Sequence, residues 1–200
     1  MPKTHNPIKE RIMTKGKGWV FFPSDFYDIS SPEAVRQCLS RMVKNKEILR
    51  LDKGIYCNPK SNKLLGIEII PPSFDDIAKR VAERDGVKII PSGDYALNRI
   101  GLSTQVPANA VYLTNGARKS ISVGEGKGII FKESNELRLF NFASEIMMLA
   151  ISSMRAIGEK LITKEQISYI KNLISKVPKE DFSHDILLAP IWVRKCLENK

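Results

Sequence analysis

Residues 31–57 have the sequence SPEAVRQCLSRMVKNKEILRLDKGIYC, and this stretch decides the fold of the N-terminal part of the chain. Ser31 is a residue type that caps helices, Pro32 is favoured at the first helical position, and the acid Glu33 suits the first turn. These signals predict a helix over Pro32–Asn45. Its apolar residues recur at helical spacing and form one stripe: Val35, Cys38, Leu39, Met42 and Val43.

A β-hairpin is predicted directly after this helix. Two runs rich in β-branched and aromatic residues, within 47–57, flank the turn Asp52-Lys53-Gly54, where glycine can adopt a positive φ. Upstream, the sequence predicts three shorter elements: a helix over 7–15, a strand over 19–22 and a short helix at 24–26. Helix, strand, helix, helix and hairpin follow one another in the order of a winged helix-turn-helix, which we therefore expect over residues 1–62.

The remaining residues, 63–200, have a mixed pattern that predicts a second domain of α+β class. Helical spacing occurs over 74–85, 94–100, 144–158, 164–176 and 184–198. Strands are predicted at 87–90, 110–113, 120–123 and 128–132. We expect a small sheet with helices packed on it and further helices that complete the C-terminal part. The boundary is placed in the polar stretch 58–63, and residues 64–70 fit a strand or an extended connector.

The composition is that of a globular protein of the cytoplasm. The chain has 200 residues, of which 42% are hydrophobic and 27% charged, and this excludes a disordered polycation. It contains no apolar run of about 18–20 residues that could span a membrane, and no secretory signal is expected. Cys38, Cys57 and Cys196 lie far apart, outside any CxxC pair and without a neighbouring His, so we expect reduced thiols and no zinc site.

The positive charge is concentrated in the N-terminal third. The whole chain has 32 Lys and Arg against 22 Asp and Glu, a formal net charge of +10. Residues 1–65 contain 13 basic and 6 acidic residues, a net charge of +7, whereas residues 66–200 have a net charge of only +3. This asymmetry predicts a small basic module with a polyanionic partner, joined to a larger and nearly balanced one.

The predicted helix 32–45 has a second, polar stripe opposite its apolar one. Its members are Arg36, Gln37, Ser40, Arg41 and Lys44. Arginine forks match guanine edges, glutamine matches adenine, and serine or lysine can bond phosphate. Because a recognition helix presents its N-terminal half to the bases, we expect Arg36, Gln37 and Ser40 to contact bases and Arg41 and Lys44 to contact phosphates.

Further DNA contacts are predicted around this helix. The additional candidates are Ser31 before the helix, Lys15 and Lys17 at the end of the first helix, and Arg50 and Lys53 on the hairpin. The alternative interpretation is that this basic stripe is only the solvated face of an amphipathic helix, and Glu33 interrupts its positive charge. The element order and the local net charge of +7 favour DNA binding.

Signals for catalysis are poor, and we expect no catalytic residue, cofactor or metal site. The glycine-rich segment 124–128 lies between two predicted strands, which favours a hairpin turn over a phosphate-binding loop. Glu125-x-Lys127, with Asp94 as a partner, supports the alternative of a metal-dependent nuclease that uses the winged helix for docking. His184-Asp185 resembles a helix N-terminus more than a catalytic pair.

The motifs of both parts resemble a known family. The first motif comprises residues 31–42 and 48–56, and the more specific second one comprises PSGDYALNRIGLSTQVP at 91–107 and YLTNG at 112–116. Together they are similar to the AbiEi-type antitoxins of bacterial abortive-infection, or type IV toxin–antitoxin, systems. The resemblance spans about residues 5–135.

The resemblance implies a cytoplasmic transcription regulator with two parts. Its winged helix would bind inverted repeats in its own promoter and repress the operon, and its C-terminal domain would counteract a nucleotidyltransferase-like toxin. Inverted repeats suit a homodimer or two monomers side by side. By position, the DNA-facing residues would be Arg36, Gln37, Ser40, Arg41, Arg50 and Lys53. Ser92–Pro107 would belong to the antitoxin domain, and for most of its residues a structural turn network is the simpler interpretation.

Overall fold

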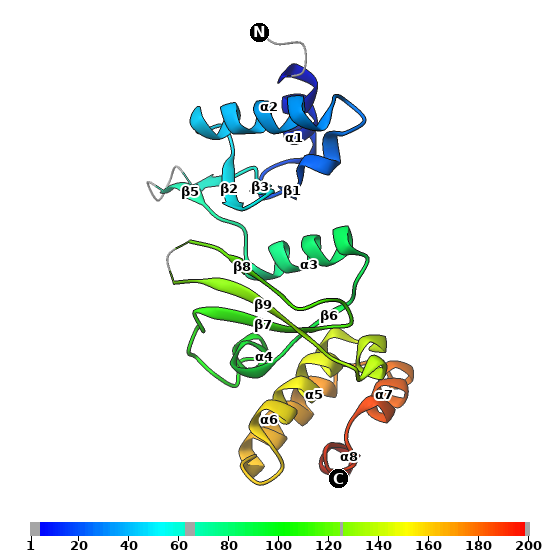
Figure 1. Ribbon diagram of the computed structural model, residues 1–200. Coiled ribbons are helices and arrows are strands. Elements are labelled where there is room, and N and C mark those ends of the chain that lie inside the picture. The colour runs from blue at the N-terminus through cyan, green and yellow to red at the C-terminus, as the bar shows by residue number, and fades with distance from the viewer. Residues whose placement is uncertain (1–4, 63–66, 125, 199–200) are drawn as a thin grey trace. The chain divides into compact units, whose positions relative to one another are not determined.

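The computed structural model describes residues 5–62, 67–124 and 126–198 (Figure 1). The fold is α+β, with a winged helix-turn-helix followed by a mixed domain, as predicted. The chain forms two compact units, Met1–Val81 with Ser122–Gly126, and Ala82–Ile121 with Lys127–Lys200. The domain boundary predicted after residue 62 stays a prediction.

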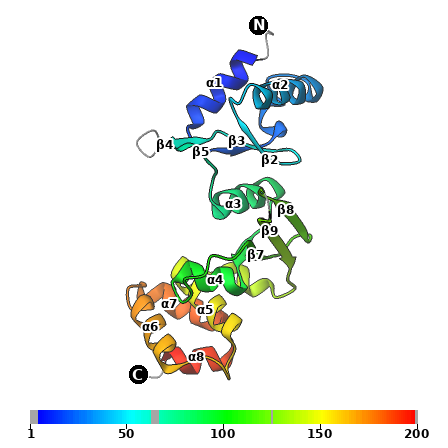
Figure 2. The same ribbon diagram turned by 90° about the vertical axis from the view of Figure 1, so that its left-hand side faces the viewer.

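The winged helix-turn-helix has the predicted order of elements. They are α1 (His5–Lys15), β1 (Val20–Phe21), η1 (Pro23–Phe26), α2 (Pro32–Lys44), β2 (Leu49–Asp52) and β3 (Ile55–Cys57). The short second helix is a 3₁₀ turn that begins at Pro23. The three strands form an antiparallel sheet in the order β1-β3-β2, and α1 and α2 cover one of its faces (Figure 2). The hairpin β2–β3 is the wing.

The apolar stripe of α2 anchors this helix to the core. Val35, Cys38, Leu39 and Met42 are buried, as predicted, and Val43 is half-buried. They pack with buried residues of the other elements: Ile8, Ile12, Phe21, Phe26, Ile48 and Tyr56. Each fully buried side chain of this size stabilises the fold by about 1.5–3 kcal/mol. Burial of one stripe therefore fixes which face of α2 remains exposed.

The buried thiol of Cys57 makes stability depend on pH in the alkaline range. Burial raises the pKa of this thiol from 9.0 to about 11. Between pH 9 and pH 11 the thiol of the unfolded chain loses a proton that the folded chain keeps. The contribution of the thiol to the free energy of unfolding is therefore complete below about pH 9 and is lost toward pH 11. We expect the unfolding free energy of the wild type, from urea titrations, to fall more steeply over this range than that of Cys57→Ala. Identical slopes for Cys57→Ala and wild type would contradict the assignment.

The polar stretch predicted as a linker contains a strand. Lys60–Asn62 forms β4 and pairs antiparallel with β5 (Ile67–Ile70), which settles 67–70 as a strand. Asn58 is buried, and its Nδ2 donates hydrogen bonds to the carbonyls of Ile12 (3.3 Å) and Gly16 (2.9 Å). A residue that looks like linker in the sequence thus joins the end of α1 to the sheet.

The second unit contains the predicted small sheet, apart from Ser122 at the end of one strand, which belongs to the first unit. Its strands are β6 (Ile89–Pro91), β7 (Asn109–Thr114), β8 (Lys119–Ser122) and β9 (Gly128–Glu133), in the order β6-β7-β9-β8. β6 is antiparallel to β7, and β7 is parallel to β9. The glycine-rich segment connects β8 to its neighbour β9, as a hairpin turn requires. The rings of Tyr112 and Phe131 stack on this sheet, with their centroids 5.8 Å apart.

Helices precede and follow the sheet. They are α3 (Phe74–Asp85), α4 (Gly93–Ile100), η3 (Leu137–Asn141), α5 (Glu145–Ile157), α6 (Lys164–Ile174), α7 (Lys179–Asp185), η4 (Ile186–Leu188) and α8 (Ile191–Glu198). The prediction of one helix over 184–198 was wrong. Pro190 has no N–H and pushes Ala189 into an extended conformation (φ −73°, ψ 152°), so α7 and η4 end before it and α8 begins after it.

Candidate nucleic-acid interface

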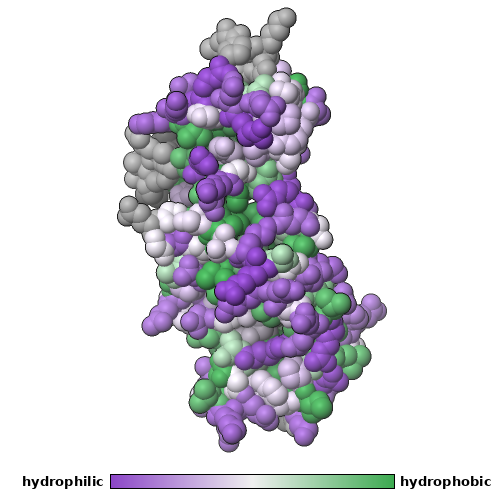
Figure 3. All heavy atoms as spheres, viewed as in Figure 1, coloured by the Kyte–Doolittle hydropathy of each residue, from purple (hydrophilic) through white to green (hydrophobic). Residues whose placement is uncertain are grey.

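The polar face of α2 is exposed to solvent. Every member of the predicted stripe has an exposed side chain: Arg36, Gln37, Ser40, Arg41 and Lys44. The Ser31 hydroxyl accepts a hydrogen bond from the Ala34 N–H at 3.4 Å and so caps the helix. Figure 3 shows hydrophilic side chains gathered over α2. The helix therefore presents donors and acceptors of the kind that base edges and phosphates require.

Two arginines of this face are oriented by neighbours on the same helix. An NH2 group of Arg36 lies 2.6 Å from Oε1 of Glu33, one turn earlier. Nε of Arg41 donates to the backbone carbonyl of Gln37 at 3.3 Å. Arg36 is thus held beside an acid in the first turn of α2, whereas Arg41 lies along the helix.

The wing presents the two predicted basic side chains. Arg50 and Lys53 are exposed, and Nε of Arg50 donates to the Asp52 carbonyl at 3.3 Å. Gly54 has φ +70°, the positive value that the turn requires. The carboxylate of Asp52 accepts from the Lys53 N–H at 2.7 Å and, within the same unit, from the Ser122 N–H at 3.1 Å. The tip of the wing is therefore fixed by hydrogen bonds on both carboxylate oxygens.

The two lysines at the end of α1 differ in their surroundings. Lys15 is exposed at the last position of the helix. Nζ of Lys17 donates to Oδ1 of the buried Asn58 at 3.3 Å, which ties this ammonium to the fold. Lys15 is therefore the better phosphate contact of the pair.

Two residues of this surface are not among the predicted DNA contacts. Lys46 is exposed directly after α2 and has φ +59°, unusual for a residue other than glycine. The run Lys44-Asn45-Lys46 was the signal that could have indicated it. Glu33 was predicted to suit the first turn of the helix and to interrupt its positive charge, and its carboxylate also contacts Arg36. The i, i+3 spacing of Glu33 and Arg36 on the predicted helix was the signal that could have indicated the pairing.

In the second unit, the motif 91–107 builds a turn network. Asn98 in α4 donates from Nδ2 to the carbonyls of Ser103 (3.3 Å) and Gln105 (2.9 Å). Gly101 ends the helix in the left-handed conformation, with φ +84°. These contacts agree with a structural interpretation of the motif, because its amide side chain bonds the backbone of its own loop.

Gly101 also provides space for a neighbouring helix. A Cβ at this position would lie 2.7 Å from the hydroxyl of Tyr169, which itself donates to the Ile100 carbonyl at 3.0 Å. We expect Gly101→Ala to lower the unfolding free energy by about 2–3 kcal/mol, from backbone strain and the displaced hydroxyl. Gly86 has φ +65° and open space around its Cβ position, so Gly86→Ala should lower the unfolding free energy only by the backbone strain.

The close contact can be tested with a double-mutant cycle in urea. Removal of the hydroxyl by Tyr169→Phe should make Gly101→Ala about 1 kcal/mol less costly. The same cost in both backgrounds would show that the hydroxyl contact contributes nothing.

His184 and Asp185 are the last two residues of α7, and Asp185 is also the N-cap residue of the 3₁₀ turn η4, without a side-chain capping bond. Asp185 is fully buried, and its carboxylate accepts hydrogen bonds from the N–H groups of Ala143 and Ser144, both at 2.8 Å. Nδ1 of His184 lies 2.7 Å from the same carboxylate. Asp185 therefore stabilises the chain at the start of α5, a structural role.

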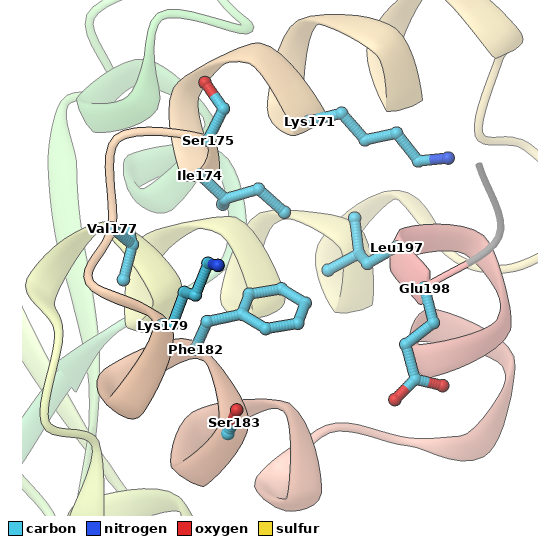
Figure 4. A pocket seen from close by; sticks show the side chains of 9 residues that line it. All are labelled: Lys171, Ile174, Ser175, Val177, Lys179, Phe182, Ser183, Leu197 and Glu198. Atoms are coloured by element: carbon cyan, nitrogen blue, oxygen red, sulfur yellow. The ribbon is translucent and has the colours of Figure 1, made fainter.

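A groove of about 470 Å³ lies between α6, α7 and α8 (Figure 4). Ile174, Val177, Phe182 and Leu197 form its apolar lining, and Lys171, Lys179 and Glu198 lie at its rim. Nothing in the structure indicates what covers it.

Three further predictions concern metal ions, the nuclease alternative and membrane spans. Within 5–62, 67–124 and 126–198, no group of three or more His, Cys, Asp or Glu could hold a metal ion. The nuclease alternative depends on Glu125, which lies outside the described residues, and Asp94 lies in the first turn of α4. In the same ranges, no helix has both the length and the apolarity to cross a membrane.

Comparison with known proteins gives a family but no function. The model of DUF6088, described as a family of unknown function, matches residues 7–182. No curated protein matches the chain. Among solved structures, a crystal structure of the RV2827C protein from Mycobacterium tuberculosis is similar at 10% identity and a TM-score of 0.47, over 99% of this chain and 82% of that chain. A TM-score below 0.5 is too low to establish a shared fold.

Proposed function

Because the chain belongs to the family DUF6088, whose function is unknown, we propose its function from its own geometry. The protein is a DNA-binding transcription regulator that represses its own operon. The observation that supports this most is the exposed face of α2, where Arg36, Gln37 and Ser40 occupy the N-terminal half of a helix in a winged helix-turn-helix. In this motif the corresponding half of the recognition helix enters the major groove.

The surrounding charges suit a DNA backbone. Five basic side chains are exposed on α2, directly after it and on the wing: Arg41, Lys44, Lys46, Arg50 and Lys53. Lysine and arginine on both sides of a recognition helix contact phosphates and fix its register on the duplex. The α2 side chains then select the sequence, and the wing and the C-terminal end of α2 supply affinity.

Binding to the region upstream of the protein's own coding sequence tests the proposal. A fluorescence anisotropy titration should show a dissociation constant at least about 1,000-fold lower for that region than for a scrambled duplex of equal composition. A reporter fused to the same region should be repressed by the protein. Equal affinity for both duplexes would contradict a specific regulator.

We also propose that the second unit counteracts a nucleotidyltransferase-like toxin. The support is the resemblance of 91–107, which form α4 and the loop after it, and of 112–116, which begin in β7, to AbiEi-type antitoxins. The product of an adjacent reading frame with a nucleotidyltransferase motif should arrest growth when expressed alone. Co-expression of this chain should relieve the arrest, and unrelieved arrest would contradict the antitoxin role.

The same proposal places the protein in the cytoplasm. Cys38, Cys57 and Cys196 are free thiols, the state that a reducing compartment maintains. A homodimer or two adjacent monomers would match inverted repeats. These two arrangements can be separated by measuring how many protein chains bind a duplex with one repeat and a duplex with two.

A further inference from the structure

The Glu33–Arg36 pair combines an acceptor and a donor at the base-reading end of α2. The two charged groups lie 2.6 Å apart, and their side chains stay 71% and 55% exposed. An ion pair on an exposed helix surface contributes only about 0.2–0.5 kcal/mol to stability. An acid in the first turn of α2 also interacts favourably with the helix dipole, by about 0.3–1 kcal/mol, so both stabilising effects of Glu33 are small.

The chemistry of the pair matches one base pair. In the major groove guanine presents two acceptors, O6 and N7, whereas cytosine presents the N4 amino donor. The contact with Glu33 uses one N–H of the Arg36 guanidinium and leaves four of its five donors. Arg36 can therefore donate two bonds to guanine while Glu33 accepts from cytosine N4.

We propose that Glu33 is a specificity-determining residue, which with Arg36 recognises a G·C base pair in the operator. This inference rests on the proposed DNA-binding function. In this recognition Glu33 has two effects. Its carboxylate orients Arg36 toward the base edge, and its negative charge repels phosphates and so weakens binding to DNA of the wrong sequence.

Selection from a random duplex library tests the inference with the full-length protein. The wild type should enrich a motif with an invariant G·C pair. For Glu33→Gln, the preference for G·C over A·T at that one position should fall by about 5- to 150-fold, because the lost contact is worth about 1–3 kcal/mol. The other positions of the motif should be unchanged.

Glu10→Gln is the matched control. Glu10 is an exposed acid on α1, outside the α2 face, so its variant has the same change in charge. Glu10→Gln should leave every base preference as in the wild type. Glu33→Gln, but not Glu10→Gln, should also bind a non-cognate duplex several-fold more tightly.

The outcomes separate this inference from the function on which it rests. If wild type enriches no motif, the proposed function and the inference both fail. If wild type enriches a motif and Glu33→Gln enriches the same motif with the same preference at every position, the function stands and the role of Glu33 is refuted.

Discussion

The double variant Arg36→Ala/Arg41→Ala should bind the upstream DNA at least about 100-fold more weakly than wild type and still be folded. Arg36 is expected to contact a base, and loss of such a contact costs about 1–3 kcal/mol. Arg41 is expected to contact a phosphate, and its loss should weaken binding to all sequences. Both side chains are exposed on α2, and neither packs into the core, so the fold should tolerate both changes.

Anisotropy titration measures this effect, with circular dichroism as the check on folding. The matched control is Arg118→Ala/Lys160→Ala, which removes two exposed positive charges from the second unit. The control should bind nearly as tightly as wild type. A folded Arg36/Arg41 variant with wild-type affinity would show that α2 is not the recognition helix.

Asp185→Ala should lower the free energy of unfolding by about 3–5 kcal/mol. The fully buried carboxylate accepts from the N–H groups of Ala143 and Ser144, and it contacts Nδ1 of His184. The variant leaves two backbone donors at the start of α5 without an acceptor, and each unsatisfied buried donor costs about 1–3 kcal/mol. This is the largest stability effect that we expect from a single polar substitution.

Urea unfolding measures the loss, and two further variants show its cause. Asp185→Asn keeps one carbonyl acceptor and should retain part of the lost stability. Glu180→Ala, an exposed position on the same helix α7, should change stability by less than about 0.5 kcal/mol. An Asp185→Ala protein within 1 kcal/mol of wild type would refute the role of the carboxylate.

The elements that sequence predicts well are those with local signals. Ser31-Pro32-Glu33 marks the start of α2, and the hydroxyl of Ser31 does cap it. Asp52-Lys53-Gly54 marks the wing turn, and Gly101 marks the end of α4. Cap, turn and helix-stop signals act through the backbone of a few neighbouring residues, so one sequence contains them completely.

The features that sequence does not show depend on contacts between distant residues. Asn58 is an ordinary polar residue in the sequence, and only its contact with α1 makes it buried and structural. Asp185 lies about 40 positions from the N–H groups that it binds. The strand β4 depends on its partner β5, since its own residues are polar.

The candidate site shows the same division. Helical spacing is enough to place Arg36, Gln37, Ser40, Arg41 and Lys44 on one exposed face. It does not show that Asn58 holds Lys17, because this contact joins residues that are far apart in the sequence. The surface is predictable as a pattern, and the roles of its members require the structure.

The salt dependence of binding to the upstream DNA tests the central claim most directly. The expected phosphate contacts are Lys15, Arg41, Lys44, Lys46, Arg50 and Lys53. Each neutralised phosphate contributes about −0.9 to the slope of log K against log salt concentration, so each bound protomer should give a slope of about −5. The account predicts this slope together with a clear preference for the upstream sequence. A slope near zero, or equal binding to the scrambled duplex, would contradict it.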